Sequence, residues 1–502
     1  MNKRIRIGQA VPAALLAGAL LLAGCSKGGS FDSGTRPNPG ANIFYDSPME
    51  SPDNETYLEI TDNPVTAASA VSTVTFSLKV DTASYSNVSR YLNQGQLPPA
   101  DAVRTEELLN YFRYEEPLEP SDGSPFAVYT EIGPSPLRKD RQMAFIRVKT
   151  LEVDKSELPP CNLTFLIDTS GSMNSYDKLP LLKTAFSLLV ETLDEDDRVS
   201  IVTYAGSSEI VLDSAGGGDK TAILDAIYNL KASGSTAGAK GIQTAYALAE
   251  KNFREGGNNR VILATDGDFN VGMSNTDDLA TFIGEKRDSG VYLSILGFGS
   301  GNIRDDIMET LSKNGNGNYA YIDTVQTAKK VLVEELGGNL FTVADDVKAQ
   351  VVFDPDVVKT YRLIGYENRM MNNEDFEDDR KDAGEIGAGT DVVALFEIEL
   401  LEPAESADPF EVRIRYKNPG ETESRLYTKS TIDSGLDTPA TTDFGFACSV
   451  AAFGHLLRQS DYTGSATPAS VLALASENIG HDPGGYRQDY LTLLRRYQDM
   501  VK

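Results

Sequence analysis

The sequence contains no tryptophan and, in 502 residues, only two histidines and three cysteines. The scarcity of histidine argues against a histidine-based zinc site and against a Ser–His–Asp triad, because both need imidazole groups. Basic residues are also few relative to acidic ones, 46 Lys and Arg against 74 Asp and Glu, which gives a net charge of −28. Such a chain is poorly suited to binding nucleic acid or a membrane through basic side chains.

Long apolar runs are absent after residue 25, so no later segment is expected to span a membrane. The early apolar run, Val11 to Ala23, is too short for a permanent transmembrane helix and follows the basic residues Lys3, Arg4 and Arg6. This arrangement is typical of a signal peptide. We therefore expect residues 1–24 to be removed.

The apolar run closes with Leu22-Ala23-Gly24-Cys25, which resembles the lipobox of bacterial lipoproteins. The resemblance implies cleavage before Cys25 and acylation of its thiol, and two or three acyl chains hold a protein stably on a membrane. Ser26 after the cysteine implies sorting to the outer membrane, on its periplasmic or surface face. Residues 25–70 are rich in Gly, Pro, Ser, Asn and Asp and are expected to form a flexible tether.

Residues 158–338 alternate between apolar strand patterns and amphipathic helix patterns. Near-continuous apolar strands between amphipathic helices predict a parallel sheet covered on both faces, that is, a doubly wound α/β domain. The expected strands are 163–167, 199–204, 261–265, 291–296 and 319–322, and the expected helices are 178–193, 221–230, 238–253, 277–287, 304–311 and 325–336.

The flanking segments show a different pattern. Residues 71–157 are predicted to form an N-terminal flanking domain of short helices and strands, residues 339–440 a β-rich domain, and residues 441–502 a C-terminal helical region. The two early strands, 126–132 and 143–148, are too few for a stable sheet alone. We therefore predict one β-sandwich assembled from about residues 124–150 and 345–432, with the α/β domain inserted in it.

Polar residues follow the first strand of the α/β domain as Asp168-Thr169-Ser170-Gly171-Ser172. In an open parallel sheet, ligands bind beyond the carboxyl ends of the strands. Two later segments are directed to the same edge and offer the hydroxyl of Thr236 and the carboxylate of Asp266. A donor set of oxygens alone suits Mg²⁺, Ca²⁺ or Mn²⁺ rather than zinc or copper.

This pattern, D-x-S-x-S with a later Thr and a later Asp, resembles the metal-ion-dependent adhesion site (MIDAS) of von Willebrand factor type A (VWA) domains at all five positions. The stretches Asp81–Phe112, Asn258–Gly272, Gly315–Asp323 and Leu363–Asn368 are similar to a bacterial family of VWA lipoproteins, whose N-terminal flanking domain and C-terminal region have no known function. The resemblance implies that Ser170 and Ser172 bind the metal directly. It implies that Asp168, Thr236 and Asp266 bind directly or through water.

The expected function is metal-dependent protein binding, for adhesion or assembly, in which an Asp or Glu of a partner protein takes the last coordination position of a divalent cation, Mg²⁺ before Ca²⁺ or Mn²⁺. No catalytic residue is predicted, and an enzyme is not expected. The alternative is a periplasmic metal-dependent hydrolase, for which Asp268 is the nearest further carboxylate in the sequence. A simpler interpretation of each hydroxyl alone is a helix cap.

Three features stay open in the sequence. Cys161 and Cys448 are expected to be buried thiols, although export would permit a disulfide. The acidic stretch Asn372–Asp382 is expected to be a solvated loop, and its spacing is not that of an EF-hand. Neither the partner nor the oligomeric state follows from the sequence.

Overall fold

The computed structural model describes residues 54–502, apart from residues 80, 115–117, 119, 121–122, 155–157, 235–237, 268–275, 336–337, 339, 382 and 402–407. Cys25, the predicted signal peptide and most of the predicted tether therefore lie outside the described residues, as do Thr236 and Asp268. None of the helices in the described part is both long enough and apolar enough to cross a membrane.

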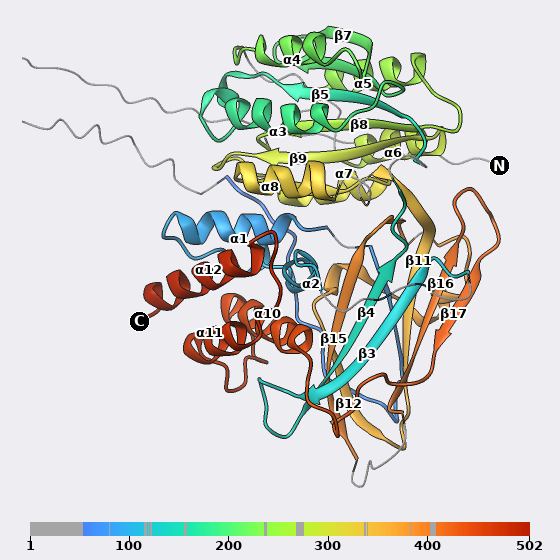
Figure 1. Ribbon diagram of the computed structural model, residues 1–502, viewed down its shortest axis with the longest axis vertical. Helices are drawn as coiled ribbons and strands as arrows, with labels where there is room; N and C mark the ends of the chain where they lie inside the picture. The colour runs from blue at the N-terminus through green and yellow to red at the C-terminus, as the bar shows by residue number, and fades with distance from the viewer. Residues whose placement is uncertain are drawn as a thin grey trace, which may run out of the picture. The chain divides into compact units, whose positions relative to one another are not determined.

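The α/β domain is built around a sheet with the strand order β10-β9-β8-β5-β6-β7, seen in the upper half of Figure 1. The central strand β5 is buried along its whole length and pairs in parallel with β6 and β8. The strands are β5 (Cys161–Asp168), β6 (Arg198–Tyr204), β7 (Ser208–Gly216), β8 (Asn258–Thr265), β9 (Val291–Phe298) and β10 (Tyr319–Ile322).

Helices cover both faces of this sheet, because its strands are apolar on both sides. One hydrophobic core joins a face of the sheet to α3, α4 and α8, and a second joins the other face to α5, α6 and α7. The predicted doubly wound fold is thus confirmed. The helices are α3 (Leu179–Glu191), α4 (Lys220–Tyr228), α5 (Gly238–Lys251), α6 (Thr276–Asp288), α7 (Asp305–Asn314) and α8 (Val325–Lys329).

Two elements of the α/β domain differ from the sequence prediction. The edge strand β7 was not predicted, and it pairs antiparallel with β6, so the sheet is not wholly parallel. The predicted helix 325–336 is α-helical only as far as Lys329 and continues as a π-helical turn, Lys330–Glu334. Most of β7 is solvent-exposed or half-buried, which explains why it carries no strong hydrophobic pattern.

Two antiparallel sheets form a β-sandwich beside the α/β domain (Figure 1). One has the order β1-β12-β15-β4-β3 and the other the order β13-β2-β11-β16-β17, and β14 pairs with β11. A single hydrophobic core fills the space between them. The strands are β1 (Thr66–Ala67), β2 (Thr73–Ser77), β3 (Phe126–Pro134), β4 (Gln142–Thr150), β11 (Thr342–Phe353), β12 (Val358–Ile364), β13 (Met370–Met371), β14 (Ile386–Gly387), β15 (Asp391–Leu400), β16 (Phe410–Lys417) and β17 (Arg425–Lys429).

The sandwich is assembled from segments on both sides of the α/β domain. β4, which precedes that domain, pairs with β15, which follows it, with Phe145 opposite Leu395. β2 joins the other sheet by pairing with β11. The prediction of one sandwich interrupted by the α/β domain is therefore confirmed.

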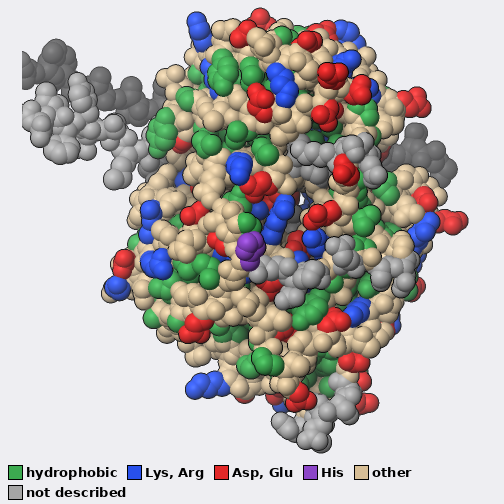
Figure 2. Space-filling model, in the orientation of Figure 1, with side chains coloured by type: hydrophobic (Ala, Val, Ile, Leu, Met, Phe, Trp, Pro, Cys, Tyr) green, Lys and Arg blue, Asp and Glu red, His purple; other side chains and the backbone are tan. Residues whose placement is uncertain are grey.

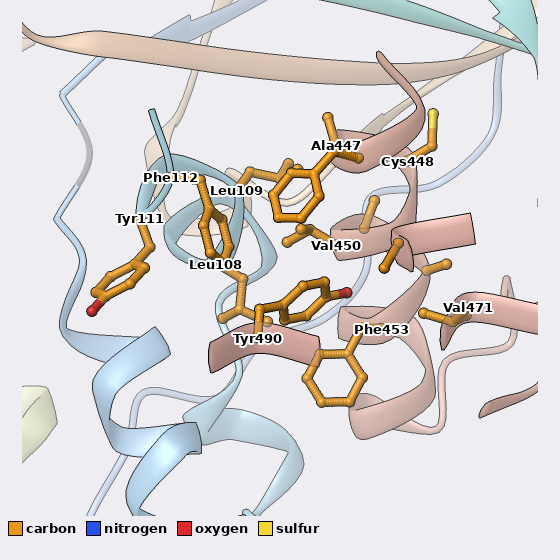
Figure 3. Close-up of a cluster of buried hydrophobic side chains, with 14 of the residues drawn as sticks. Leu108, Leu109, Tyr111, Phe112, Ala447, Cys448, Val450, Phe453, Val471 and Tyr490 are labelled. Carbon is orange, nitrogen blue, oxygen red and sulfur yellow. The ribbon is translucent and has the colours of Figure 1, made fainter. Parts of the chain in front are cut away.

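The N-terminal and C-terminal helices share a further core, although the sequence prediction treated them as separate parts. Phe112 lies edge-on to Tyr490, with ring centroids 5.5 Å apart, as Figure 3 shows for the neighbouring side chains. It also lies edge-on to Phe446, with ring centroids 4.9 Å apart. The C-terminal helix that contains Gly454 packs closely against Thr105. A Cβ atom at position 454 would lie 2.7 Å from the Thr105 side chain, so the glycine allows this approach. The helices are α1 (Ala83–Asn93), α2 (Thr105–Asn110), α10 (Thr442–Arg458), α11 (Pro468–Glu477) and α12 (Tyr486–Met500), and short 3₁₀ turns cover Ala100–Ala102, Gly171–Asn174, Glu367–Arg369 and Asn373–Phe376.

The predicted tether ends earlier than residue 70. Residues 66 and 67 form β1 on the sandwich, and the backbone of Thr56 donates to Ile303 of the α/β domain at 2.9 Å. The composition of residues 54–70 is that of a linker, but their backbone and polar side chains bond to the folded body. The prediction of a flexible tether is therefore wrong for residues 54–70.

The acidic stretch 372–382 uses its carboxylates locally. Asn372 and Asp375 cap the short turn Asn373–Phe376 reciprocally. Asp378 pairs with Arg380, and Asp379 pairs with Arg415 of β16. These contacts favour a surface loop, as predicted.

Both cysteines of the described part are buried free thiols, as expected. Cys161 begins β5, and Cys448 lies in α10 within the core of the terminal helices. Burial raises the pKa of the Cys161 thiol to about 12 and that of Cys448 still higher. Neither thiol is suited to nucleophilic chemistry near neutral pH.

Candidate functional site

Asp168 and Asp266 lie side by side at the carboxyl edge of the α/β sheet. β5 and β8 are adjacent and parallel, with Ile167 opposite Ala264, so Asp168 at the end of β5 and Asp266 directly after β8 come to the same edge. Both carboxylates are fully buried. The sequence prediction that these two residues share one edge is therefore met by the strand register.

The Asp168 carboxylate is bonded through only one of its oxygens. Its Oδ1 accepts a hydrogen bond from the backbone N–H of Ser170 at 2.8 Å, while the buried Oδ2 has no hydrogen bond of ordinary geometry, although the Tyr204 side chain is close enough to lower the pKa of the carboxyl. Burial raises the pKa of Asp168 to about 6, and the nearby Asp266 carboxylate acts in the same direction. A raised pKa of this kind is expected for a buried carboxylate that has no positively charged partner.

The two serine hydroxyls of the D-x-S-x-S loop face each other. Ser170 Oγ and Ser172 Oγ are 2.9 Å apart, and Ser170 is buried whereas Ser172 is exposed. The loop thus leads from the buried Asp168 to the solvent. An ion held beside these hydroxyls would keep one side open to a second molecule.

Thr236 lies outside the described residues, but the chain just before it is bonded to the Asp168 loop. Gly171 N–H donates to Gly234 O at 3.0 Å, and Ser233 N–H donates to Thr169 O at 2.8 Å. Gly234 adopts a positive φ of 84°, which glycine tolerates best. These bonds bring the segment that leads to Thr236 against the loop of Asp168 and Ser170.

Lys178, which the sequence analysis did not single out, completes the described site. Its Nζ lies 3.0 Å from Asp266 Oδ2, and both side chains are buried. The lysine stem fits under Gly299, where an added Cβ would lie 2.3 Å from Lys178 Cε. Lys178 therefore neutralises Asp266 and leaves the charge of Asp168 uncompensated.

A loop from residue 299 to residue 304 supports the Asp266 side of the site. Gly267, next to Asp266, has a φ of 102° and no room for a Cβ, which would lie 2.2 Å from Asn302 O. The N-terminal segment holds the same loop, because Glu55 Oε1 accepts from Gly301 N–H at 2.8 Å. No sequence pattern indicated this contact, which joins the end of the predicted tether to the vicinity of the site.

The donor chemistry of the site fits a hard divalent cation. Two carboxylates and two hydroxyls offer oxygen alone, and one carboxylate oxygen is an orphaned buried acceptor. The described residues contain no group of three or more His, Cys, Asp or Glu side chains that could hold a metal ion, so a cation at this edge would depend on hydroxyl ligands as well as carboxylates. His455 is buried in α10 against Arg362, and His481 lies in the loop before α12, so neither belongs to this edge.

Comparisons with known proteins agree with this architecture. Residues 162–334 match the family model of the von Willebrand factor type A domain, residues 51–144 match the model described as von Willebrand factor, and residues 338–500 match that of the C-terminal part of uncharacterized protein YfbK. Uncharacterized protein YfbK of Escherichia coli (strain K12) is 41% identical over an alignment of 470 residues, which covers 89% of this chain and 81% of that protein.

Two further proteins are similar to this chain, with lower sequence identity or over a smaller part of the chain. Uncharacterized protein sll0103 of Synechocystis is 31% identical over 170 residues, 34% of this chain and 39% of that protein. The solved structure of von Willebrand factor type A from Catenulispora acidiphila is 15% identical, with a TM-score of 0.42, over 77% of this chain and 92% of that one.

Proposed function

The chain belongs to the family of bacterial proteins that combine a VWA domain with the C-terminal region of YfbK, and we propose that its α/β domain captures an acidic group of a partner protein through a divalent cation. The VWA domain indicates an interaction or adhesion module at the coarse level. The proposal adds to this general role a bound cation and an acidic ligand. They follow from the chemistry of the carboxyl edge.

The residues proposed to hold the cation are Asp168, Ser170, Ser172, Thr236 and Asp266. Mg²⁺ is the first choice for such oxygen donors, and Ca²⁺ and Mn²⁺ are compatible. When bound, the cation supplies an electrophilic position that a carboxylate oxygen of the partner can occupy. The chain itself positions the ion, and exposed Ser172 leaves the approach open to solvent.

The observation that carries the proposal is the state of Asp168. Its carboxylate is fully buried, no cationic side chain of the described residues forms an ion pair with it, and the neighbouring acid is already neutralised by Lys178. Leaving a carboxylate buried without a partner is costly, and a cation beside it removes that cost. The apolar strands around Asp168 do not compensate the charge of its carboxylate.

Binding rather than hydrolysis is favoured by the groups that surround the two acids. The carboxylates of Asp168 and Asp266 are assigned to the cation in this proposal, Lys178 Nζ bonds to Asp266, and Asp268 lies outside the described residues. A hydrolase would need a general base that can reach the attacking water. We therefore propose no catalytic residue.

The proposed location is the cell envelope, with the chain anchored to the outer membrane by acyl groups on Cys25. The signal-peptide pattern and the lipobox resemblance of residues 1–25 support this location.

We predict that Lys178→Met has opposite effects on the binding of the cation and on the binding of a carboxylate ligand. Removal of the ammonium group leaves both acids uncompensated, so the affinity of the site for Mg²⁺ or Mn²⁺ should rise about tenfold, equivalent to ~1.4 kcal/mol. The loaded site would carry less positive charge, and its affinity for a carboxylate ligand should fall. Titration calorimetry with Mn²⁺, and then with glutarate on the Mn²⁺-loaded protein, measures both effects.

The matched control for that variant is Lys251→Met, which breaks an exposed Lys–Asp pair on the same domain. This control should leave both affinities unchanged. Equal affinities in the wild type and Lys178→Met would show that Lys178 does not share the site with the ion.

Partner capture tests the proposed function as a whole. The wild-type chain, immobilised in Mg²⁺, should retain a protein from native membranes, release it in EDTA and rebind it when Mg²⁺ is restored. Ser170→Ala should retain little of the same protein, because it removes a hydroxyl ligand without disturbing the core. A partner that remains bound both in EDTA and on Ser170→Ala would rule out capture through the metal.

A further inference from the structure

A second candidate site lies between the α/β domain and the β-sandwich, away from the carboxyl edge. A cavity of about 320 Å³ opens there, lined from the α/β side by Arg260, Ser294 and Asn316 and from the sandwich side by Ile386. Its volume is at the lower end of the range found for small-molecule sites. In the face shown in Figure 2, acidic and basic side chains gather around a hollow at the level where the α/β domain meets the rest of the chain.

Arg260 is the unusual group in this cavity. It is 3% exposed, and its Nη1 donates to Ser294 Oγ at 2.8 Å, while Nε is buried with no acceptor among the described residues. No carboxylate of the described residues lies within ion-pair distance of its guanidinium. Burial accordingly lowers the pKa of Arg260.

The other buried arginines of the described part behave differently. Six of the seven buried arginines have a carboxylate within 4.0 Å, and Arg260 is the exception. Buried charges in proteins are normally paired, because an isolated one carries a large desolvation cost. The six paired residues are Arg90, Arg104, Arg147, Arg362, Arg369 and Arg487.

No acid of the cavity wall in the described part forms an ion pair with Arg260. Each of them pairs with another cation, and Glu385 acts on Arg260 from beyond ion-pair distance, in the direction that raises its pKa. Asp81 pairs with Arg369, Asp391 with Arg147, and Glu385 with Lys79. The wall carboxylates with such a partner are Asp81, Glu152, Glu334, Glu335, Glu385 and Asp391. Arg260, whose guanidinium carbon lies 5.5 Å from the centre of the Tyr292 ring, is thus the buried cation of this wall that has no ion-pair partner among the described residues.

A buried acceptor on the same wall defines the rest of the ligand chemistry. Oδ1 of Asn316 has no donor among the described residues. Apolar side chains such as Leu332 and Ile386 line other parts of the cavity. A matching ligand carries an anionic group for Arg260, a hydrogen-bond donor and a small apolar body.

We propose that this cavity binds a small organic anion, a carboxylate or a phosphate ester, with Arg260 as its counter-ion. The ligand would contact both the α/β domain and the sandwich, and its occupancy would hold these two parts together. The proposal does not depend on the metal site. Arg260 and Asp266 lie at opposite ends of the strand β8, so each site can be tested while the other is intact.

The test uses the purified mature chain and two probe anions, succinate for carboxylates and glycerol 3-phosphate for phosphate esters, each compared with chloride. At least one probe should bind with 1:1 stoichiometry in calorimetry and raise the melting temperature by about 2–4 °C near saturation. The probe with the larger shift identifies the anionic group. No binding by either probe beyond the effect of chloride would overturn the proposal.

Arg260→Met keeps the apolar stem and removes the charge. It should weaken the binding of the probe at least about tenfold and leave the melting temperature of the ligand-free protein equal to that of the wild type, or higher, because no ion pair of the described residues is broken. Arg415→Met, which removes a surface arginine of the sandwich, is the matched control and should bind the probe normally. A large loss of stability in ligand-free Arg260→Met would make Arg260 a structural residue and contradict the proposal.

Discussion

Arg104→Met should destabilise the protein by about 3–5 kcal/mol, the range expected when one partner of a buried ion pair is removed. Arg104 Nε lies 2.5 Å from Glu107 Oε1, and Arg104 Nη1 lies 2.5 Å from Asp305 Oδ2. All three side chains are almost completely buried. Without the guanidinium, both acids would stay buried and uncompensated.

The effect should be large because these acids belong to a wider cluster. Glu309 lies 3.8 Å from Arg104 and 3.6 Å from Arg369, which also pairs with Asp81. The cluster joins α2, α7 and the sandwich segment that holds Arg369, so four buried acids share two guanidinium groups. Burial raises the pKa of Glu107 to about 8 even in the presence of Arg104.

Urea denaturation, followed by circular dichroism, measures this loss as a lower midpoint. Arg380→Met removes an arginine from an exposed pair with Asp378 and should leave the midpoint unchanged. Adding Asp305→Asn and Glu107→Gln to Arg104→Met should restore part of the stability, since the acids are then neutral. An unchanged midpoint in Arg104→Met itself would mean that the cluster does not stabilise the contact between the domains.

The second large effect is expected at the metal site. Asp168→Ala should lower the affinity for Mg²⁺ and Mn²⁺ at least about 100-fold, because it removes the buried carboxylate whose charge is not compensated by the chain. The wild type should gain about 2.7 kcal/mol of stability at a metal concentration 100 times the Kd, and the variant should gain almost none.

The ligand-free stability of Asp168→Ala separates loss of metal from loss of fold. Removal of a buried carboxylate without a cation partner should not weaken the metal-free protein. Asp213→Ala, which removes an exposed acid of the same domain, is the matched control and should respond to Mg²⁺ as the wild type does. Equal metal-induced stabilisation in Asp168→Ala and the wild type would contradict the assigned ligand set.

Sequence periodicity predicted the parts of the fold that depend on apolar burial. The buried strand β5 and the amphipathic helix α3 were recognisable because their apolar residues repeat with the strand and helix periods. The joining of β4 to β15 was also predictable, since the two strands that precede the α/β domain are too few for a stable sheet alone. The edge strand β7 escaped prediction because most of its residues are exposed or half-buried.

Contacts made by polar groups could not be inferred in the same way. The bond from Gly301 to Glu55 and the ion pair of Lys178 with Asp266 join segments that are distant in sequence. Periodicity carries no information on which lysine is folded inward or which acid is buried. Asp168, Ser170, Ser172 and Asp266 were predictable as a group only because parallel strands end at one edge.

The most direct test of the metal site is a crystal of the wild-type protein soaked in Mn²⁺ and measured at a wavelength that gives anomalous scattering from manganese. We expect one strong peak within bonding distance of the Ser170 and Ser172 hydroxyls and beside the carboxylates of Asp168 and Asp266. Absence of a peak there at a Mn²⁺ concentration that saturates binding in solution, or a peak held by other residues, would contradict the proposed site.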